Sequence, residues 1–337
     1  MVKSILMEVK NKKILILRFG ALGDIVHTTV IAQALKKAYP DCEIFYCVEE
    51  RYSEIIENCE FIDKIIPYDQ KQRKKLLYNI KFALTLRKEK FDIIFNLTNV
   101  FRNNMIAVIA NPKRIIAHKK DRNLHVVQDF YKTASNIIKG LILPKNLILG
   151  IDENILINVK NNLSCYPRPY FIFSPGGSTD KNRQGRIWNK DYWVELGNEL
   201  VKLYGGTVFV TGTKDEAEFH HYIVSNIKNS VMYSGKLSLN ELKCLYKLAD
   251  LFVSGDTGPL HLASAFGVNT IGIYGSTDVK NVSPYGEKGF SVYPDENQCR
   301  FCWKKKCKFL KDNETYTPCM ESIKPEKVLE LIEEVLK

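Results

Sequence analysis

The stretch Ser254-Gly-Asp-Thr-Gly-Pro-Leu-His-Leu-Ala-Ser264 decides how this sequence folds. The apolar residues 251–253 before it predict a buried strand, and the small and apolar residues 260–266 predict a helix. A glycine-containing turn between them directs the unpaired backbone N–H groups of the helix start beyond the end of the strand. Such groups commonly bind phosphate. The stretch therefore predicts an α/β fold with an anion site.

Two side chains of this turn can contribute to an anion site. Thr257 supplies a hydroxyl donor, and His261, one turn into the helix, supplies a second donor or a cation. The alternative is a structural role, in which Asp256 caps the helix and Pro259 lies near its first position. The turn alone leaves both interpretations open, but a second loop of this kind favours the first.

That second loop is Arg18-Phe-Gly-Ala-Leu-Gly-Asp24, which follows an apolar predicted strand at residues 13–19. Gly20 and Gly23 permit a sharp turn and the close approach of another molecule. The spacing G-x-x-G lacks the middle glycine of the dinucleotide fingerprint, which argues against an oxidoreductase. Asp24 is either a carboxylate that points beyond the sheet or the cap of the following helix.

Two more glycine loops follow predicted strands in the second half of the chain. Ser174-Pro-Gly-Gly-Ser-Thr179 carries the hydroxyls of Ser178 and Thr179, and the cation Arg186 follows shortly after. This combination predicts a diphosphate site. Gly212-Thr-Lys-Asp-Glu216 offers carboxylates to ribose hydroxyls, although an acid at a helix start is also a common cap.

Strands and helices alternate through both halves of the chain. A polar break at residues 161–169 separates the halves. Two such halves predict two Rossmann-like parallel-sheet domains with helices on both faces, which face each other across a cleft where the ligands bind, beyond the carboxyl ends of the strands. The predicted strands cover residues 13–19, 43–48, 62–66, 91–97, 115–116, 170–174, 207–211, 251–254 and 270–274, and the predicted helices cover 24–39, 191–204, 216–226, 239–248 and 324–337.

The chain has 337 residues and a net charge of +11, which favours acidic partners such as nucleic acid, anionic lipid or phosphorylated small molecules. Residues 71–90 carry eight Lys or Arg and one acid, Glu89, among apolar residues. They predict either a basic amphipathic helix at a membrane surface or an ordinary surface helix. The sequence has no apolar run long enough to span a membrane and no secretory signal, so we expect a cytoplasmic protein.

Taken together, the loops resemble those of the heptosyltransferases, glycosyltransferase family 9. The resemblance covers nearly the whole chain and rests on R-x-x-A-L-G-D at 18–24, P-G-x-S at 175–178 with a cation two residues before Trp188, and D-T-G-P-x-H-x-A at 256–263. It implies a GT-B-like fold. The domains are then residues 1–165, which bind the acceptor, and 166–323, which bind the nucleotide sugar and include the Cys-rich segment 298–320, with a C-terminal helix at 324–337.

The same resemblance assigns roles to single residues. Asp24 matches the catalytic base, and Glu216 matches a ribose-binding acid in competition with Asp215 and Glu218. Arg186 stands where the family usually has Lys, which keeps the charge and changes its geometry. The donor-binding residues are then Ser178, Thr179, Arg186, Glu216, Asp256, Thr257, Gly258 and His261. For the acceptor we expect Gly23, Arg102 and Arg122.

The implied reaction is an inverting transfer of heptose from ADP-heptose to a hydroxyl group. Asp24 takes the hydroxyl proton, while Arg186 and the N–H groups at Thr257 and Gly258 stabilise the departing diphosphate. The sequence contains no D-x-D motif of metal-dependent glycosyltransferases, so we expect no catalytic cofactor. We expect lipopolysaccharide inner core as the acceptor, with peripheral association at the inner face of the inner membrane.

Four of the nine cysteines lie close together in the sequence, at Cys299, Cys302, Cys307 and Cys319. Four thiols with a C-x-x-C pair match the ligand number of a tetrahedral Zn or Fe site, so we expect a structural metal there. Four reduced thiols, or a disulfide formed on oxidation, are the alternatives.

Two alternatives to this function remain open at this point. The first is a heptosyltransferase of the autotransporter type, whose acceptor is a protein. The second is a non-enzymatic two-lobed protein that binds a nucleotide or sugar, although this alternative gives Asp24 no role. Nucleic-acid binding has no motif to support it.

Overall fold

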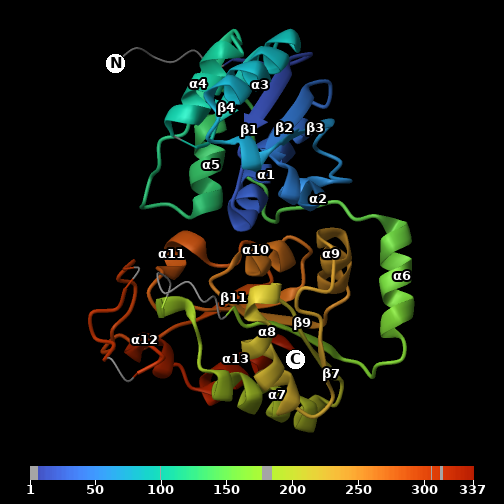
Figure 1. Cartoon of the computed structure of the whole chain (residues 1–337), viewed down its shortest axis with the longest axis vertical. Coiled ribbons are helices and arrows are strands. Elements are labelled where there is room, and N and C mark those ends of the chain that lie inside the picture. Colours follow the sequence, from blue (N-terminus) through green and yellow to red (C-terminus); the bar gives the residue numbers. More distant parts are fainter. Residues whose placement is uncertain (1–6, 99, 177–183, 305, 312–313) are drawn as a thin grey trace. The chain divides into compact units, whose positions relative to one another are not determined.

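The computed structural model describes residues 7–98, 100–176, 184–304, 306–311 and 314–337. The chain divides into two units, Met1–Gly150 and Ile151–Lys337. Figure 1 shows the first unit in blue to green and the second in green to red. Each unit has its own parallel sheet.

The first unit is built on a five-stranded sheet in the order β3-β2-β1-β4-β5. All pairs are parallel, and Ile14 of β1 lies between Ile44 of β2 and Ile93 of β4. Because the carboxyl ends of parallel strands meet at one edge, the loops after β1, β4 and β5 are neighbours there. The strands are β1 (Lys13–Leu17), β2 (Glu43–Glu49), β3 (Lys64–Tyr68), β4 (Ile93–Asn96) and β5 (Arg114–Ala117).

Helices cover this sheet in two pairs, α1 with α5 and α3 with α4 (Figure 1). The second pair encloses a core in which Leu86 and Ile106 meet Phe45 and Ile94 of the sheet. The helices are α1 (Leu22–Ala38), α2 (Ser53–Ile56), α3 (Leu76–Lys88), α4 (Phe101–Ile109) and α5 (Val126–Ser135), with 3-10 turns η1 (Glu50–Tyr52) and η2 (Gln70–Gln72).

The second unit is built on a six-stranded parallel sheet in the order β11-β10-β9-β6-β7-β8. Strands β9, β6 and β7, which precede the three glycine loops of this unit, are therefore neighbours. The strands are β6 (Tyr170–Ser174), β7 (Thr207–Val210), β8 (Ser230–Met232), β9 (Leu251–Gly255), β10 (Asn269–Ile273) and β11 (Gly289–Val292).

Aromatic side chains fill the core of the second unit. Trp188 and Trp193 are fully buried, with ring centroids 4.9 Å apart, and Ile332 of α13 belongs to the same cluster. The helices are α6 (Glu153–Leu163), α7 (Lys190–Tyr204), α8 (Ala217–Ser225), α9 (Leu239–Lys247), α10 (Gly258–Ser264), α11 (Val279–Val282), α12 (Pro318–Glu321) and α13 (Pro325–Val335), with 3-10 turns η3 (Gln184–Arg186) and η4 (Lys214–Glu216).

The predicted boundary after residue 165 is wrong, because the units divide after Gly150. Helix α6 lies on the far side of that division and packs against α9. The Tyr170 hydroxyl of β6 also donates a hydrogen bond to the Leu163 carbonyl, 2.8 Å away. The C-terminal helix packs against α7, so it is part of the second unit and not a separate element.

The predicted class of two parallel-sheet α/β units is confirmed. The nine predicted strands exist, with bounds that differ by a few residues. No helix in the described part of the chain is both long and apolar enough to cross a membrane.

Candidate functional site

Asp24 does not cap helix α1. The helix begins at Leu22, its N-cap residue is Ala21, and no side chain caps it. Asp24 is the third helical residue, and its Oδ2 forms an ion pair with Nη2 of Arg18. The Asp24 side chain is 40% exposed. The structural alternative for Asp24 is therefore wrong, and its carboxylate is available to a ligand at the carboxyl edge of the first sheet.

Arg18 fixes the position of that carboxylate. Its Nη1 donates hydrogen bonds to the Leu97 carbonyl at 2.8 Å and to the Thr98 hydroxyl at 3.2 Å, both just after β4. Its guanidinium carbon also lies 5.8 Å from the ring centroid of Phe130. Arg18 therefore joins β1, β4 and α5 to Asp24. Sequence reasoning gave Arg18 no role, although its place at the end of an apolar strand was a usable signal.

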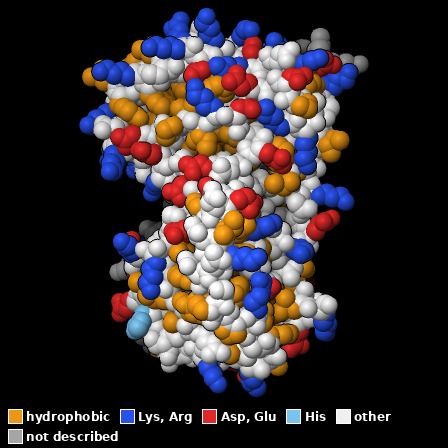
Figure 2. Space-filling view, turned by 90° about the vertical axis from the view of Figure 1, so that its right-hand side faces the viewer, with side chains coloured by type: hydrophobic (Ala, Val, Ile, Leu, Met, Phe, Trp, Pro, Cys, Tyr) orange, Lys and Arg blue, Asp and Glu red, His pale blue; other side chains and the backbone are white. Residues whose placement is uncertain are grey.

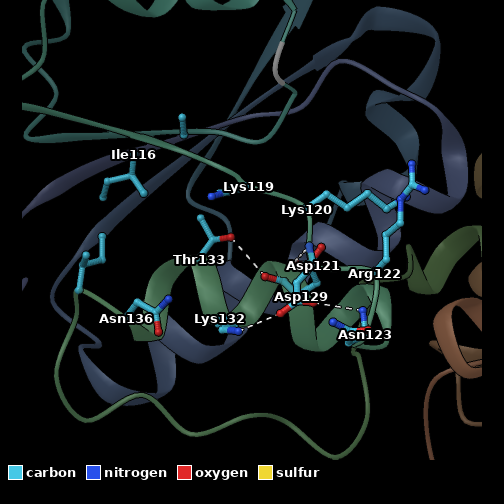
Figure 3. A pocket seen from close by; sticks show the side chains of 12 residues that line it. Ile116, Lys119, Lys120, Asp121, Arg122, Asn123, Asp129, Lys132, Thr133 and Asn136 are labelled. Carbon is cyan, nitrogen blue, oxygen red and sulfur yellow. Dashed lines mark hydrogen bonds and ion pairs between the residues drawn. The ribbon is translucent and has the colours of Figure 1, made fainter.

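A hollow of about 590 Å³ lies at the same sheet edge, between the residues after β5 and helix α5 (Figure 3). Four cations line it, and its two acids already have partners. Asp129 contacts Nε2 of His118 at 3.2 Å, and Asp121 accepts from Lys132 at 3.0 Å. The positive charge of the hollow is thus in excess and suits an anionic ligand. The lining cations are Lys119, Lys120, Arg122 and Lys132.

His118 and Asp129, the second of which lines this hollow, are largely buried and have shifted pKa values. Burial lowers the pKa of His118, although the charge of Asp129 opposes that change. Burial likewise raises the pKa of Asp129. His118 Nδ1 also contacts the Thr133 hydroxyl at 2.8 Å, and Asp129 Oδ1 accepts from the backbone N–H of Asp121 at 3.1 Å. The pair therefore holds the loop after β5 against α5, and the sequence gave no signal for it.

The predicted acceptor residues are spread along this edge. Gly23 is buried directly before Asp24. Arg102, at the start of α4, has its guanidinium 5.1 Å from the Phe19 ring centroid and 5.5 Å from that of Tyr68. Arg122 lines the hollow, and Arg102 does not. The two arginines therefore occupy different places at the edge of one sheet.

In the second unit, Asp256 does not cap helix α10 either. The helix begins at Gly258 with Thr257 as its N-cap residue. Asp256 Oδ2 lies 3.2 Å from Nη2 of Arg186, and Oδ1 lies 3.8 Å from Nε2 of His261. Burial raises the pKa of Asp256, but hydrogen bonding by His261 and the charge of Arg186 outweigh burial, so its pKa is lowered.

The loop after β9 is held to its neighbours by short contacts. The Ser254 hydroxyl donates to the Ser174 carbonyl at 2.7 Å and contacts the Thr257 hydroxyl at 2.9 Å. A side chain at Gly255 would place its Cβ 2.8 Å from the Arg186 carbonyl oxygen, so this close approach needs glycine. Arg186, Asp256, Thr257, Gly258 and His261 are thus gathered at the end of β9.

The described start of the loop after β6 lies beside this group. Gly176 adopts a φ of +65°, and a Cβ there would lie 3.5 Å from Cγ2 of Thr257. The predicted phosphate-binding residues Ser178 and Thr179 lie outside the described residues.

Glu216 is engaged in a helix cap. Its Oε2 accepts hydrogen bonds from the backbone N–H of Thr213 at 2.8 Å and from the Thr213 hydroxyl at 2.9 Å. These contacts form the capping box of η4. Glu216 therefore does cap the helix, as the structural alternative predicted. Ribose binding by Glu216 would have to use the same carboxylate.

The predicted metal site at the four cysteines is not supported. No group of three or more His, Cys, Asp or Glu side chains within the described ranges could hold a metal ion. Burial raises the pKa of the Cys319 thiol, which lies 3.2 Å from the Thr317 hydroxyl. Cys319 packs into the core of the second unit, whereas Cys302 is exposed. The residue types match a metal site, but the described side chains do not form a recognisable ligand group.

Comparisons with known proteins agree with these observations. Residues 79–312 match the sequence model of "Glycosyltransferase family 9 (heptosyltransferase)". The chain is 26% identical to a lipooligosaccharide heptosyltransferase 2 of Campylobacter jejuni over 330 residues, which cover 94% of this chain and 96% of that relative.

Two solved structures show the same fold. One is a glycosyl transferase family 9 protein from Veillonella parvula, with a TM-score of 0.80, 18% identity, and coverage of 98% of this chain and 99% of that chain. The other is the E. coli ADP-heptose lps heptosyltransferase II, with a TM-score of 0.76, 19% identity, and coverage of 96% and 98%. The GT-B-like fold class predicted from the sequence is confirmed.

Proposed function

Because the chain belongs to glycosyltransferase family 9, the heptosyltransferases, we propose that it transfers a heptose from ADP-heptose to a hydroxyl group of lipopolysaccharide inner core. The names of its relatives, a lipooligosaccharide heptosyltransferase and an ADP-heptose lps heptosyltransferase, support this choice of donor and acceptor. The observation that carries the proposal is the Arg18–Asp24 pair, which presents a partly exposed carboxylate at the carboxyl edge of the first sheet. A general base needs an oxygen lone pair that the substrate hydroxyl can reach, and a partly exposed carboxylate offers one.

In the proposed reaction, the acceptor hydroxyl oxygen attacks the anomeric carbon of the heptose. The bond from that carbon to the diphosphate oxygen breaks, and its electron pair leaves with ADP. Asp24 accepts the hydroxyl proton, and Arg18 keeps the carboxylate oriented toward the acceptor. Attack on the face opposite the leaving group inverts the configuration at the anomeric carbon.

The donor-binding role falls to the second unit. Arg186, which Asp256 holds beside the loop after β9, offers a fork of donors to the diphosphate. The Thr257 hydroxyl and the backbone N–H groups at Thr257 and Gly258 add further donors. Ser178, Thr179, Glu216 and His261 keep their proposed donor-binding roles. None of these groups requires a metal ion to bind a diphosphate.

The acceptor-binding role falls to the first unit, with Gly23, Arg102 and the basic hollow that contains Arg122. Four cations against two engaged acids fit the phosphate groups of a phosphorylated inner core. Since such an acceptor is anchored in lipid, the enzyme would work in the cytoplasm at the inner face of the inner membrane.

The test is an assay of ADP release from ADP-heptose with and without acceptor. The proposal predicts release that depends on heptose-deficient lipopolysaccharide core, and a product whose anomeric configuration, measured by NMR, is opposite to that of the donor. Transfer to an autotransporter peptide in preference to core would replace the acceptor assignment. Tight ADP-heptose binding without transfer to either would support a non-enzymatic binding protein instead.

A further inference from the structure

The outer faces of α3 and α4 carry apolar side chains that the core does not use. Phe101 is 82% exposed, Leu77 is 74% exposed and Val108 is 64% exposed. Leu76, Leu84 and Val100 are exposed as well. The inner faces of the same helices already fill the core, through Ala83, Leu86, Ile106, Ala107 and Ala110. The exposed residues therefore need another explanation than the stability of the fold.

These side chains are concentrated in one part of the chain. Residues 76–108 hold six of the sixteen large hydrophobic side chains that are exposed in the described parts of both units. Single exposed apolar residues are ordinary on a protein surface, whereas a cluster of this kind marks an interaction site.

The cluster extends along two helices that lie side by side. On α3, residues 77, 81, 84 and 88 share one face because they are three or four positions apart. On α4, Phe101 and Val108 share a face for the same reason. Both helices run from the carboxyl edge of a parallel sheet, and they pack against each other. The exposed apolar side chains therefore belong to two neighbouring helices.

The first turns of both helices meet at one aromatic side chain. The Tyr78 ring of α3 lies 5.5 Å from the Tyr68 ring, and the Arg102 guanidinium of α4 lies 5.5 Å from the same ring. Leu76, Leu77, Val100 and Phe101, which neighbour these residues in sequence, thus gather at the sheet edge that also carries Asp24. We call this group, with Leu84 and Val108, the α3–α4 apolar face.

The segment that forms α3 is rich in cations. Eight Lys or Arg side chains lie in residues 71–90, and none of them forms an ion pair with a carboxylate that the structure describes. The one acid, Glu89, is already bound by Lys13 at 2.6 Å and Lys64 at 3.0 Å. Figure 2 shows one side of the first unit, in the upper part of the view, where hydrophobic, basic and acidic side chains are interspersed. The charge is complementary to an anionic surface.

The order of residues favours lipid over a protein partner. Lys81 and Lys88 interrupt the leucine stripe of α3, so a protein that covered the stripe would bury their ammonium groups. At a bilayer surface the same lysines extend toward anionic headgroups, while leucine and phenylalanine enter the boundary of the acyl chains.

We propose that the α3–α4 apolar face binds the surface of an anionic lipid bilayer, with Leu77 and Phe101 inserted below the headgroups. This contact holds the edge that carries Asp24 close to the lipid surface. The inference of lipid binding depends only on the exposed residues and the charges. The inference that this contact brings Asp24 close to a lipid-anchored acceptor rests on the proposed function.

The test is co-sedimentation of the full chain with vesicles of phosphatidylcholine, with and without phosphatidylglycerol. We expect binding only to the anionic vesicles, and a loss of roughly tenfold or more in the double variant Leu77→Ser, Phe101→Ser, because two apolar side chains no longer insert. Lys81→Glu with Lys88→Glu should also abolish binding at moderate salt. The matched controls are Ile142→Ser, at an 80% exposed position outside the face, and Lys228→Glu in the second unit.

Several results would overturn the proposal. These are equal binding to both vesicle types, an unchanged affinity in the face variants, or an equal loss in the controls. Self-association through the face without vesicle binding would assign it to a second copy of the chain. An assay of heptose transfer to a delipidated core fragment separates lipid binding from the proposed function. The face variants should retain this transfer activity. If the unchanged chain lacks the activity, only the proposed function is contradicted.

Discussion

Arg186 and Asp256 form an ion pair, with Nη2 of the arginine 3.2 Å from Oδ2 of the carboxylate. The two residues are far apart in sequence, and the pair joins η3 to the loop after β9. Both residues were expected to bind the donor. Asp256 is buried and its carboxylate holds Arg186, which remains partly exposed. A ligand at this edge would meet the arginine first.

Asp256→Asn should lower the free energy of unfolding by about 1–3 kcal/mol near neutral pH, because it leaves partly buried Arg186 without its charged partner. The folded state binds the Asp256 proton less tightly than the unfolded state, since its pKa lies below the ordinary 3.8. The carboxylate therefore stabilises the folded state at pH values above its ordinary pKa. This stabilisation is lost as the pH falls through the lower pKa that Asp256 has in the folded state.

Urea denaturation at several pH values measures this effect. The difference between the unchanged chain and Asp256→Asn should shrink in acid. The exposed Asp215→Asn is the control and should change little. A difference that grows in acid would contradict the assignment.

His118 should remain neutral at neutral pH. Burial lowers its pKa from 6.5, and the nearby charge of Arg18 lowers it further. An NMR titration of the imidazole should give a midpoint below 6.5. In Asp129→Asn the midpoint should fall again, because the carboxylate favours the charged imidazolium. A midpoint above the ordinary value, or a rise in that variant, would show that the pair is charged.

The basic hollow should determine how tightly a phosphorylated acceptor binds. Arg122→Ala should raise KM for the phosphorylated core about tenfold with little change in kcat, since a charged hydrogen bond is lost on binding alone. A dephosphorylated core should show a much smaller effect of the same substitution. Lys228→Ala in the second unit is the control. An equal effect on both acceptors would argue against phosphate binding at Arg122.

Glu216→Gln separates the two roles of this residue. The capping box should weaken, so the free energy of unfolding should fall by about 1 kcal/mol. If Glu216 also binds ribose, KM for ADP-heptose rises in this variant and stays constant in Asp215→Asn and Glu218→Gln. A loss of stability with an unchanged KM would leave Glu216 only its structural role.

Much of the fold was predictable because buried parallel strands are short apolar runs between turn residues. Residues 13–17 and 251–255 illustrate this, since almost every side chain in them is buried. Helix α6 was missed because its five apolar residues lie among polar ones, and only two of them, Val159 and Leu163, are buried. The domain boundary was misplaced for the same reason.

The site was predictable in composition and only partly in arrangement. Asp24 and Asp256 were ambiguous because both precede or begin helices, where acids commonly cap. Their actual partners, Arg18 and Arg186, can be assigned only when the strands are placed next to each other. The cysteines show the opposite case, in which a convincing spacing is not matched by a group of ligands among the described side chains.

The most direct test of the central claim is the turnover of Asp24→Asn, measured together with its affinity for ADP. With Asp24 as the general base, kcat should fall about 10²–10⁴-fold while the ADP dissociation constant and the unfolding transition stay near those of the unchanged chain. A variant that retains its turnover, or that loses ADP affinity and stability in step with turnover, would contradict the role of Asp24 as the general base.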